Sequence, residues 1–250
     1  MNILVTNDDG IRSPGIKALA RSMQEIGQVC VVAPDREQSA VSHALTLHHP
    51  LRAVRLSENR YAVDGTPTDC VNLGIHSLMQ ARPDLVVSGI NRGSNLGEDV
   101  TYSGTVSAAM EATLMGVPAL AFSLACNGDD GIWDDAAEVA RRIVNLSLST
   151  GFPPDTLLNV NIPNLHVDKM AGIRVTTQGK RRYDGTIIDK IDPRGRTYYW
   201  IGSDNLRFID IEGSDYWAVS RGYVSITPLH LDLTNHRILS ALVGWNGPLP

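Results

Sequence analysis

The stretch Met1-Asn2-Ile3-Leu4-Val5-Thr6-Asn7-Asp8-Asp9-Gly10 decides the fold. Its apolar, partly β-branched run Ile3–Thr6 has the length of a buried strand, and it stops at two adjacent carboxylates and a glycine. In open α/β sheets, ligands bind just beyond the carboxyl ends of the parallel strands. Asp8 and Asp9 therefore occupy a place where a binding site is common. The alternative is a solvated turn, because Asn-Asp-Asp-Gly is also good turn chemistry.

Strand and helix patterns alternate through the first two thirds of the chain. Strands are expected at 3–6, 29–33, 85–87, 119–124 and 158–162, and helices at 15–26, at 67–78, after 103–105 as far as 115, and at 134–148. The segment 45–56 is expected to be an irregular or antiparallel excursion, because Pro50 argues against a central strand. The alternation predicts right-handed βαβ units and an α/β fold with a doubly wound, mainly parallel sheet.

The pattern changes after about Asn164. Strands are expected at 174–177, 197–201 and 216–227 with no helix of any length between them, and a last helix from Asn235 to about 243. We therefore predict a core at residues 1–164, followed at 165–250 by a β-rich hairpin extension and a C-terminal helix. Oligomerisation is the role expected for such an arm, and a folded-back subdomain is the alternative.

Composition narrows the class of protein. The chain has 250 residues, of which 43% are hydrophobic and 20% charged, as in ordinary globular proteins, and its formal net charge is −5. An acidic balance argues against nucleic acid as the main partner, because that requires a basic face. No apolar stretch has the length of a membrane span. Cys30, Cys70 and Cys126 form no metal or disulfide pattern, so a reducing cytoplasm is the expected location.

Polar residues follow three of the predicted strands, at what would be one edge of the sheet. Asp8 and Asp9 follow the first strand, Ser39 lies beyond the second, and Asn91 and Asn95 follow the strand at 85–87. Two carboxylates, a hydroxyl and an amide carbonyl would form an all-oxygen shell for a divalent cation, with room for water and a substrate oxygen. No histidine recurs at these strand ends, which argues against zinc.

A second motif opens the predicted helix that ends near residue 115. Ser103-Gly104-Thr105 would offer backbone N–H groups, two hydroxyls and the partial positive charge of a helix start, which together suit a phosphate. The alternative is an ordinary N-cap, as also for Gly65-Thr66-Pro67-Thr68. The loop around Asn91 is dense in glycine, which indicates close approach of the backbone to a ligand.

With these residues in view, the chain resembles the SurE family of survival-protein nucleotidases. The resemblance runs in order along almost the whole chain. The matching runs are Asn7-Asp8-Asp9-Gly10, Val32-Ala33-Pro34-Asp35-Arg36, Ser39, Gly65-Thr66-Pro67-Thr68-Asp69-Cys70-Val71, Val87-Ser88-Gly89-Ile90-Asn91, Tyr102-Ser103-Gly104-Thr105-Val106, Leu158-Asn159-Val160-Asn161-Ile162-Pro163 and Gly222-Tyr223-Val224-Ser225-Ile226-Thr227-Pro228-Leu229.

The resemblance implies a Rossmann-like catalytic core and a metal-dependent phosphatase acting on nucleoside 5′- and 3′-monophosphates, with short polyphosphate as a further substrate of some members. It implies one divalent cation per subunit, Mg²⁺ or Mn²⁺, and a homodimer or homotetramer formed by exchange of the C-terminal hairpin. The residues it assigns are the metal ligands Asp8, Asp9, Ser39 and Asn91, with Asp8 and Asp9 also catalytic, and the phosphate-binding Asn95, Ser103, Gly104 and Thr105.

Several alternatives stay open. Three mechanisms are possible for the reaction. Water could attack the phosphorus directly, Asp8 or Asp9 could take a proton from that water, or one of these carboxylates could itself attack and form an acyl phosphate. A nucleotide sensor without turnover is the main rival function. A signalling receiver domain would be much shorter and would need a phosphorylatable Asp on a later strand, and a phosphoaspartate phosphatase would have an Asp-x-Asp pattern. The basic run Lys180-Arg181-Arg182 is interpreted as a solvated surface, with attraction of polyanionic substrates as the alternative.

Overall fold

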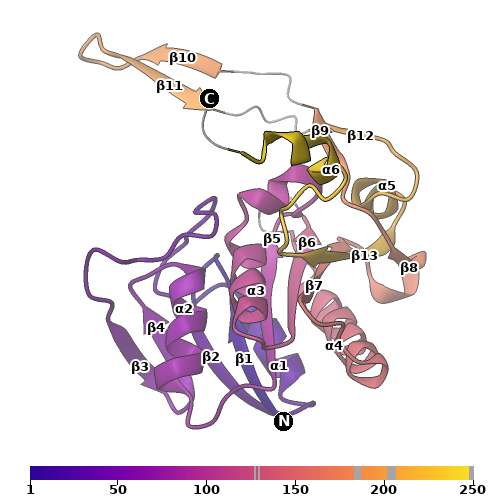
Figure 1. The fold of residues 1–250 in the computed structure, drawn as a ribbon. Helices are drawn as coiled ribbons and strands as arrows, with labels where there is room; N and C mark the ends of the chain where they lie inside the picture. The colour runs from indigo at the N-terminus through magenta and orange to yellow at the C-terminus, as the bar shows by residue number, and fades with distance from the viewer. Residues whose placement is uncertain (127, 129, 183–186, 202–206, 248–250) are drawn as a thin grey trace.

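The structure is a computed structural model that describes residues 1–250 except 127, 129, 183–186, 202–206 and 248–250. A nine-stranded sheet forms its centre (Figure 1). In spatial order the strands are β3 (Ala53–Ser57), β4 (Arg60–Val63), β2 (Gln28–Pro34), β1 (Asn2–Thr6), β5 (Leu85–Arg92), β6 (Ala119–Ala125), β7 (Thr156–Pro163), β13 (Tyr223–His230) and β8 (Gly172–Val175).

The sheet is mainly parallel. Strands β4, β2, β1, β5, β6 and β7 all run in one direction. At one edge β3 is antiparallel to β4, and at the other β13 is antiparallel to β7, with β8 parallel to β13. This arrangement confirms the predicted α/β fold. The excursion predicted at 45–56 ends in the antiparallel edge strand β3, which also agrees.

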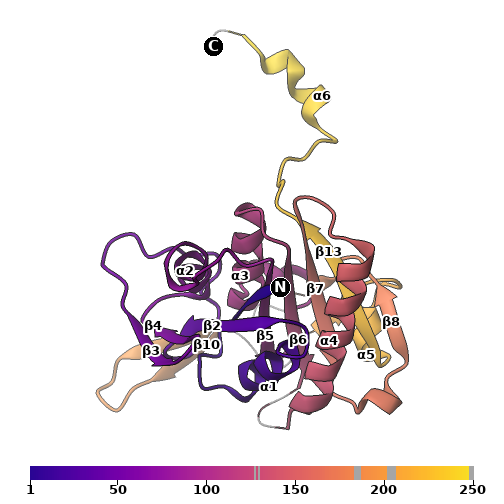
Figure 2. The same ribbon diagram turned by 90° about the horizontal axis from the view of Figure 1, so that it is seen from below.

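Helices cover both faces of the sheet (Figure 2). On one face lie α2 (Pro67–Leu73), extended by the π-helical turn η1 (Gly74–Leu78), and α3 (Gly104–Leu114), which follows the short 3₁₀ helix η2 (Gly97–Thr101). The other face carries α1 (Pro14–Met23) and α4 (Trp133–Thr150). None of the helices among the described residues is long and apolar enough to cross a membrane.

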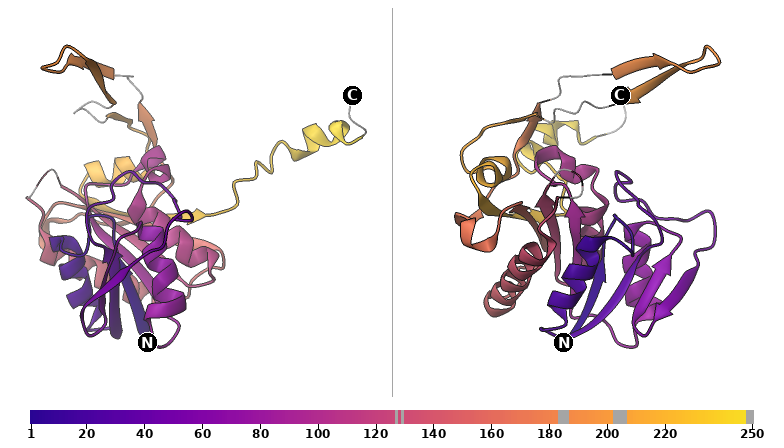
Figure 3. Two further views of the ribbon diagram at one scale, coloured as in Figure 1. Left: turned by 90° about the vertical axis from the view of Figure 1, so that its left-hand side faces the viewer. Right: turned by 180° about the vertical axis from the view of Figure 1, so that it is seen from behind.

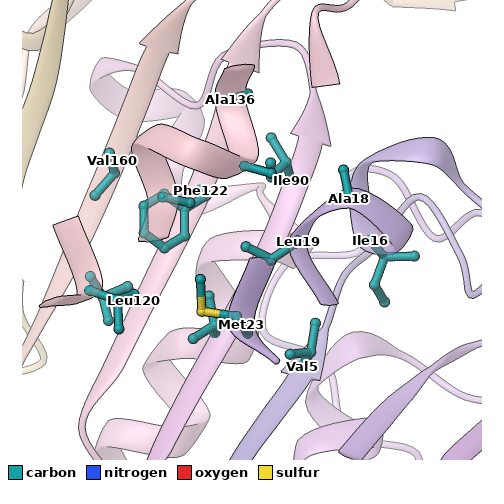
Figure 4. Close-up of a cluster of buried hydrophobic side chains, with 14 of the residues drawn as sticks. Val5, Ile16, Ala18, Leu19, Met23, Ile90, Leu120, Phe122, Ala136 and Val160 are labelled. Carbon is teal, nitrogen blue, oxygen red and sulfur yellow. The ribbon is translucent and has the colours of Figure 1, made fainter. Parts of the chain in front are cut away.

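The core forms two layers because side chains alternate along each strand. Figure 4 shows Val5, Leu120 and Phe122 packed with Leu19 and Met23 of α1, on the face that α1 and α4 cover. The intervening residues of the same strands face α2 and α3 and form a second cluster. Burial on both sides explains why the strands are continuous apolar runs rather than alternating ones.

Capping side chains mark the starts of α1, α2 and α3, at or within one residue of the predicted positions. The Ser13 side chain caps α1, and Thr66 with Asp69 forms a reciprocal capping box at α2, one residue before its first-turn proline. Ser103 caps α3, its Oγ accepting from the Val106 N–H at 3.1 Å. These side chains bind N–H groups that have no partner inside the helix, so each helix begins at a defined residue.

The later part of the chain forms an arm and a tail. Strands β9 (Lys180–Arg182) and β12 (Arg207–Ile209) pair antiparallel at the base of the arm, and β10 (Ile187–Ile191) pairs with β11 (Thr197–Ile201) beyond it. After β13 the chain leaves the body and carries α6 (Leu239–Leu242) and η4 (Val243–Trp245) at a distance from the sheet (Figure 3). A short 3₁₀ turn, η3 (Val167–Lys169), precedes β8.

Two predictions for this region need correction. The strand expected at 216–227 is wrong over its first part, because α5 (Asp215–Ser220) is a short helix whose N-cap, Ser214, accepts from the Trp217 N–H. The last helix is shorter than the predicted 235–243, since only 239–242 is α-helical. The division at residue 164 stays a prediction, and the structure adds that the later segment returns to the central sheet through β8 and β13.

Candidate active site

Five of the predicted site residues lie around one cavity. Asp8, Ser39, Asn91, Asn95 and Ser103 line a hollow of about 570 Å³ at the carboxyl ends of β1 and β5. They come from the segment after β1, the loop after β2, the end of β5 with the loop that follows it, and the start of α3. The parallel sheet brings them together because its strands all end at the same edge.

Asp8 is the most buried member, with 4% of its surface exposed. Its Oδ1 accepts a hydrogen bond from the Thr105 hydroxyl, and its backbone carbonyl accepts from the Gln38 N–H at 2.8 Å. Burial raises the pKa of this carboxyl, and the bond from Thr105 partly opposes that shift. Thr105 therefore orients Asp8 and favours its ionised form.

Asp9 lies beside it and is held by a different group. Its Oδ2 accepts from the backbone N–H of Arg92 at 2.9 Å. Burial, with the charge of Asp8 adding to it, raises the pKa of Asp9 to about 6. Two adjacent, partly desolvated carboxylates disfavour each other's charge, and a bound cation would relieve both effects.

A bulge in β5 places Asn91. Ser88 lies opposite Ala121 while Asn91 lies opposite Ser123, so β5 carries one residue more than β6 over this interval. Gly89 sits in the bulge at φ +136°, and a Cβ there would lie 2.4 Å from the backbone oxygen of Phe122. Beyond the bulge the Asn91 Nδ2 donates to the Gly93 carbonyl at 2.8 Å. The Oδ1 atom is then the ligand that Asn91 can offer.

A buried polar frame holds Asn95. Its Nδ2 donates to the Ser123 Oγ at 2.8 Å, and its backbone N–H donates to the Asn161 Oδ1 at 2.8 Å. The amide nitrogens of Asn159 and Asn161 both donate back to the Asn95 carbonyl, at 2.9 and 3.0 Å. Neither Asn159 nor Asn161 is among the predicted site residues. The available signal was two asparagines alternating inside the apolar strand β7.

The start of α3 lies directly against Asp8. A Cβ on Gly104 would come within 2.9 Å of the Asp8 Cβ and 3.1 Å of its Oδ2, so only glycine permits this approach. Ser103 is an N-cap, the alternative interpretation of the motif, and it also lines the cavity. Gly104 and Thr105 are not among the residues that line the cavity. Gly104 packs closely against Asp8, and the Thr105 hydroxyl donates a hydrogen bond to it.

Ser39 lies on an exposed loop, where its Oγ donates to the Glu37 carboxylate at 2.6 Å. The loop is anchored further on, since Ser42 bonds to the backbone of 101–102 and the His43 Nε2 lies 2.6 Å from the Glu111 Oε2. The hydrogen bond with His43 holds the pKa of Glu111 below its usual value. His43 thus anchors the loop and does not line the cavity.

Several residues that line the cavity were not predicted as site residues, among them Arg92, Asp99, Tyr102 and Arg181. Asp99 lies within the 3₁₀ helix η2 and Tyr102 at its C-terminal end, just before Ser103, and Arg181 reaches the cavity from β9 of the arm. The basic run that contains Arg181 was interpreted as a solvated surface. No local pattern could have placed it here, because its contacts with Glu98 and Asp99 join residues more than eighty positions apart.

The donor set fits a hard cation. No group of three or more His, Cys, Asp or Glu gathers anywhere in the part of the chain that the structure describes. Asp8 lines the cavity and Asp9 follows it in the chain, and together with the neutral oxygen donors of Ser39 and Asn91 they suit Mg²⁺ or Mn²⁺ better than zinc. A larger hollow, of about 660 Å³, lies against α1 and β2 and contains none of the predicted site residues. We therefore place the chemistry in the smaller cavity.

Known proteins are similar to this chain along almost its whole length. The family described as survival protein SurE matches residues 3–185. The 5′-nucleotidase SurE of Geotalea uraniireducens (strain Rf4) is 65% identical over 246 residues, covering 98% of this chain and 99% of the relative. That of Geobacter metallireducens is 63% identical over 246 residues, 98% of each chain. The crystal structure of SurE from Aquifex aeolicus is 48% identical with a TM-score of 0.89, over 99% of this chain and 100% of that one.

Proposed function

The chain belongs to the SurE family, and from this premise we propose that it is a metal-dependent 5′-nucleotidase that converts nucleoside 5′-monophosphates to nucleoside and phosphate. The observation that carries the proposal is the single cavity in which Asp8, Ser39, Asn91, Asn95 and Ser103 meet. Hydrolysis of 3′-monophosphates and short polyphosphate, which the family resemblance implies, is part of the same proposal.

Asp8, Asp9, Ser39 and Asn91 would hold one divalent cation, Mg²⁺ or Mn²⁺. When bound, it would polarise the phosphoryl group and neutralise charge that develops during the reaction. The fit is supported by the buried carboxyl of Asp8 and the half-buried carboxyl of Asp9 beside it, because desolvation raises the pKa of both and a bound cation would favour their charged forms.

The remaining residues would bind and orient the phosphate. Ser103 is the N-cap of α3, and this end of the helix lies next to Asp8. The N-terminus of a helix carries partial positive charge, which would attract the phosphate. Asn95, held on both sides by the β6 and β7 side chains, would add a rigid polar contact. We propose direct in-line attack by water, in which the protein contributes mainly positioning and electrostatic stabilisation.

The first experiment is phosphate release from a panel of nucleoside 5′- and 3′-monophosphates and short polyphosphate, with Mg²⁺, with Mn²⁺ and with excess chelator. We expect release that the chelator abolishes. Asp8→Asn should remove turnover without loss of folding, whereas Asp134→Asn, an exposed residue on α4, should not alter it. Nucleotide binding without release in the wild type would instead support the sensor. A fully active Asp8→Asn variant would overturn the metal site.

We also propose a homodimer or homotetramer built through the arm and the tail. Large apolar side chains are exposed on both segments, including Ile191 at 71%, Trp200 at 64% and Trp245 at 82%. Exposed apolar surface of this extent is typical of an interaction site. Light scattering of the intact chain should give a mass of two or four subunits. The cytoplasm remains the predicted location, supported by three buried free cysteines.

A further inference from the structure

Arg181 is hydrogen-bonded to η2, the short helix that precedes the Ser103-Gly104-Thr105 motif. Its backbone N–H donates to the Glu98 carboxylate at 2.5 Å, and its Nη1 donates to the Asp99 Oδ1 at 2.6 Å. The side chains of Arg181 and Asp99 are 23% and 16% exposed, so the pair is largely shielded from solvent. Two consecutive acids of η2 thus fix both the backbone and the guanidinium of one arginine.

A second set of bonds holds the same two segments together. The Asp215 Oδ2 accepts from the Gly97 N–H at 2.8 Å, and its Oδ1 accepts from the Gly179 N–H at 2.9 Å. Gln178 adds a bond from its Nε2 to the Gly97 carbonyl at 2.7 Å. Asp215 has no exposed surface. The base of the arm is therefore a rigid attachment to the edge of the cavity and not a loosely placed loop.

The charged residues that line the cavity suggest what Arg181 binds. The charged residues that line it are the acids Asp8 and Asp99 and the cations Arg92 and Arg181. A phosphate monoester brings close to two negative charges, which must be matched when it enters beside Asp8 and Asp9. A guanidinium carries five N–H donors in a planar fork, which suits phosphate oxygens. The ion pair with Asp99 keeps the Nη1 atom of this guanidinium at the wall of the cavity.

We propose that Arg181 binds substrate, with its guanidinium donating to a non-bridging oxygen of the phosphate. The inference rests on the proposed function and adds a contact to it. It also means that the arm completes the substrate site, because Arg181 lies in the 165–250 segment and not in the 1–164 core. Whatever the arm contributes to assembly, the cavity needs its base.

The test uses the full-length protein loaded with Mn²⁺ and inorganic phosphate as the probe. Calorimetry measures phosphate affinity directly, so the result stands even if no nucleotide is hydrolysed. We expect Arg181→Gln to weaken phosphate binding by about tenfold to a hundredfold, the loss of one hydrogen bond between charged groups. Mn²⁺ affinity and subunit mass should not change. Arg182→Gln alters the neighbouring exposed residue and should leave phosphate affinity as in the wild type.

Asp99→Asn separates a contact from a structural role. It removes a negative charge from the cavity yet keeps an oxygen that can accept from the Arg181 Nη1. A substrate contact therefore predicts phosphate affinity at least equal to that of the wild type, whereas a purely structural clasp predicts weakening like that of Arg181→Gln. Unchanged phosphate affinity in Arg181→Gln, or a parallel loss in Asp99→Asn, would overturn the proposal. If the variants change phosphate affinity as expected but the wild type hydrolyses no nucleotide, the nucleotidase function would be wrong and the Arg181 contact would stand.

Discussion

Replacing Thr105 by valine tests how the start of α3 controls the carboxylate beneath it. Thr105 has no exposed surface, and its hydroxyl donates to the Oδ1 of Asp8, which is only 4% exposed. Valine keeps the shape and removes the donor. A hydrogen bond to a charged group contributes about 1.5–3 kcal/mol, so its loss should raise the pKa of Asp8 further. Loss of such a supporting bond costs about tenfold to a hundredfold in metal affinity.

The assay is a Mn²⁺ titration near neutral pH, followed by nucleotide hydrolysis at saturating metal. We expect Thr105→Val to bind Mn²⁺ about tenfold or more weakly and to lose part of its activity even when loaded. Thr105→Ser retains the donor and should recover most of the affinity. Thr113→Val is the matched control on the same helix, because the Thr113 hydroxyl donates only to the Ala109 carbonyl. Wild-type metal affinity and activity in Thr105→Val would refute this account.

Two further changes address the same pair of carboxylates. Gly104→Ala would place a Cβ 2.9 Å from that of Asp8 and should reduce kcat/KM by about a hundredfold through displacement, whereas Gly244→Ala, with nothing within 4 Å, should be silent. Burial raises the pKa of Asp9 from 3.8 to about 6, so the folded, metal-free protein holds this proton more tightly and loses stability as the pH rises through that interval. Asp9→Asn should therefore be inactive yet, in chelator at neutral pH, more stable by about 1–2 kcal/mol in urea unfolding. Equal or lower stability than the wild type would contradict this.

The sheet was predictable because its strands are local patterns. The apolar runs that became β1, β2, β5, β6 and β7 are short, continuous and separated by amphipathic or capped helices. Such patterns depend on neighbours a few residues away, and a parallel sheet then follows from the right-handed crossover. Prediction failed at α5, where the Ser214 cap was overlooked in an aromatic segment that suggested a strand.

Part of the candidate site was predictable for a related reason. Asp8 and Asp9 follow β1 and Asn91 lies near the carboxyl end of β5, and these strand ends converge in a parallel sheet whatever the loops between them do. The bulge that sets Asn91 was not predictable in detail, because it depends on how Gly89 meets the Phe122 carbonyl of the neighbouring strand. Asn95 was predicted as a site residue, but its hydrogen bonds with the asparagines of β7 were not predictable, because they join residues more than sixty positions apart.

The sequence by itself determined the α/β class, the order of the strands along the chain, the helix caps and the carboxylate pair, since each of these is encoded in residues close to one another. Tertiary structure decided which side chains share the cavity and how they are held. It alone set Thr105 on Asp8 and brought Arg181 of the arm to Asp99. Contacts of this kind join residues more than eighty positions apart. They depend on how the whole core packs, and a pattern of neighbouring residues carries no information about that packing.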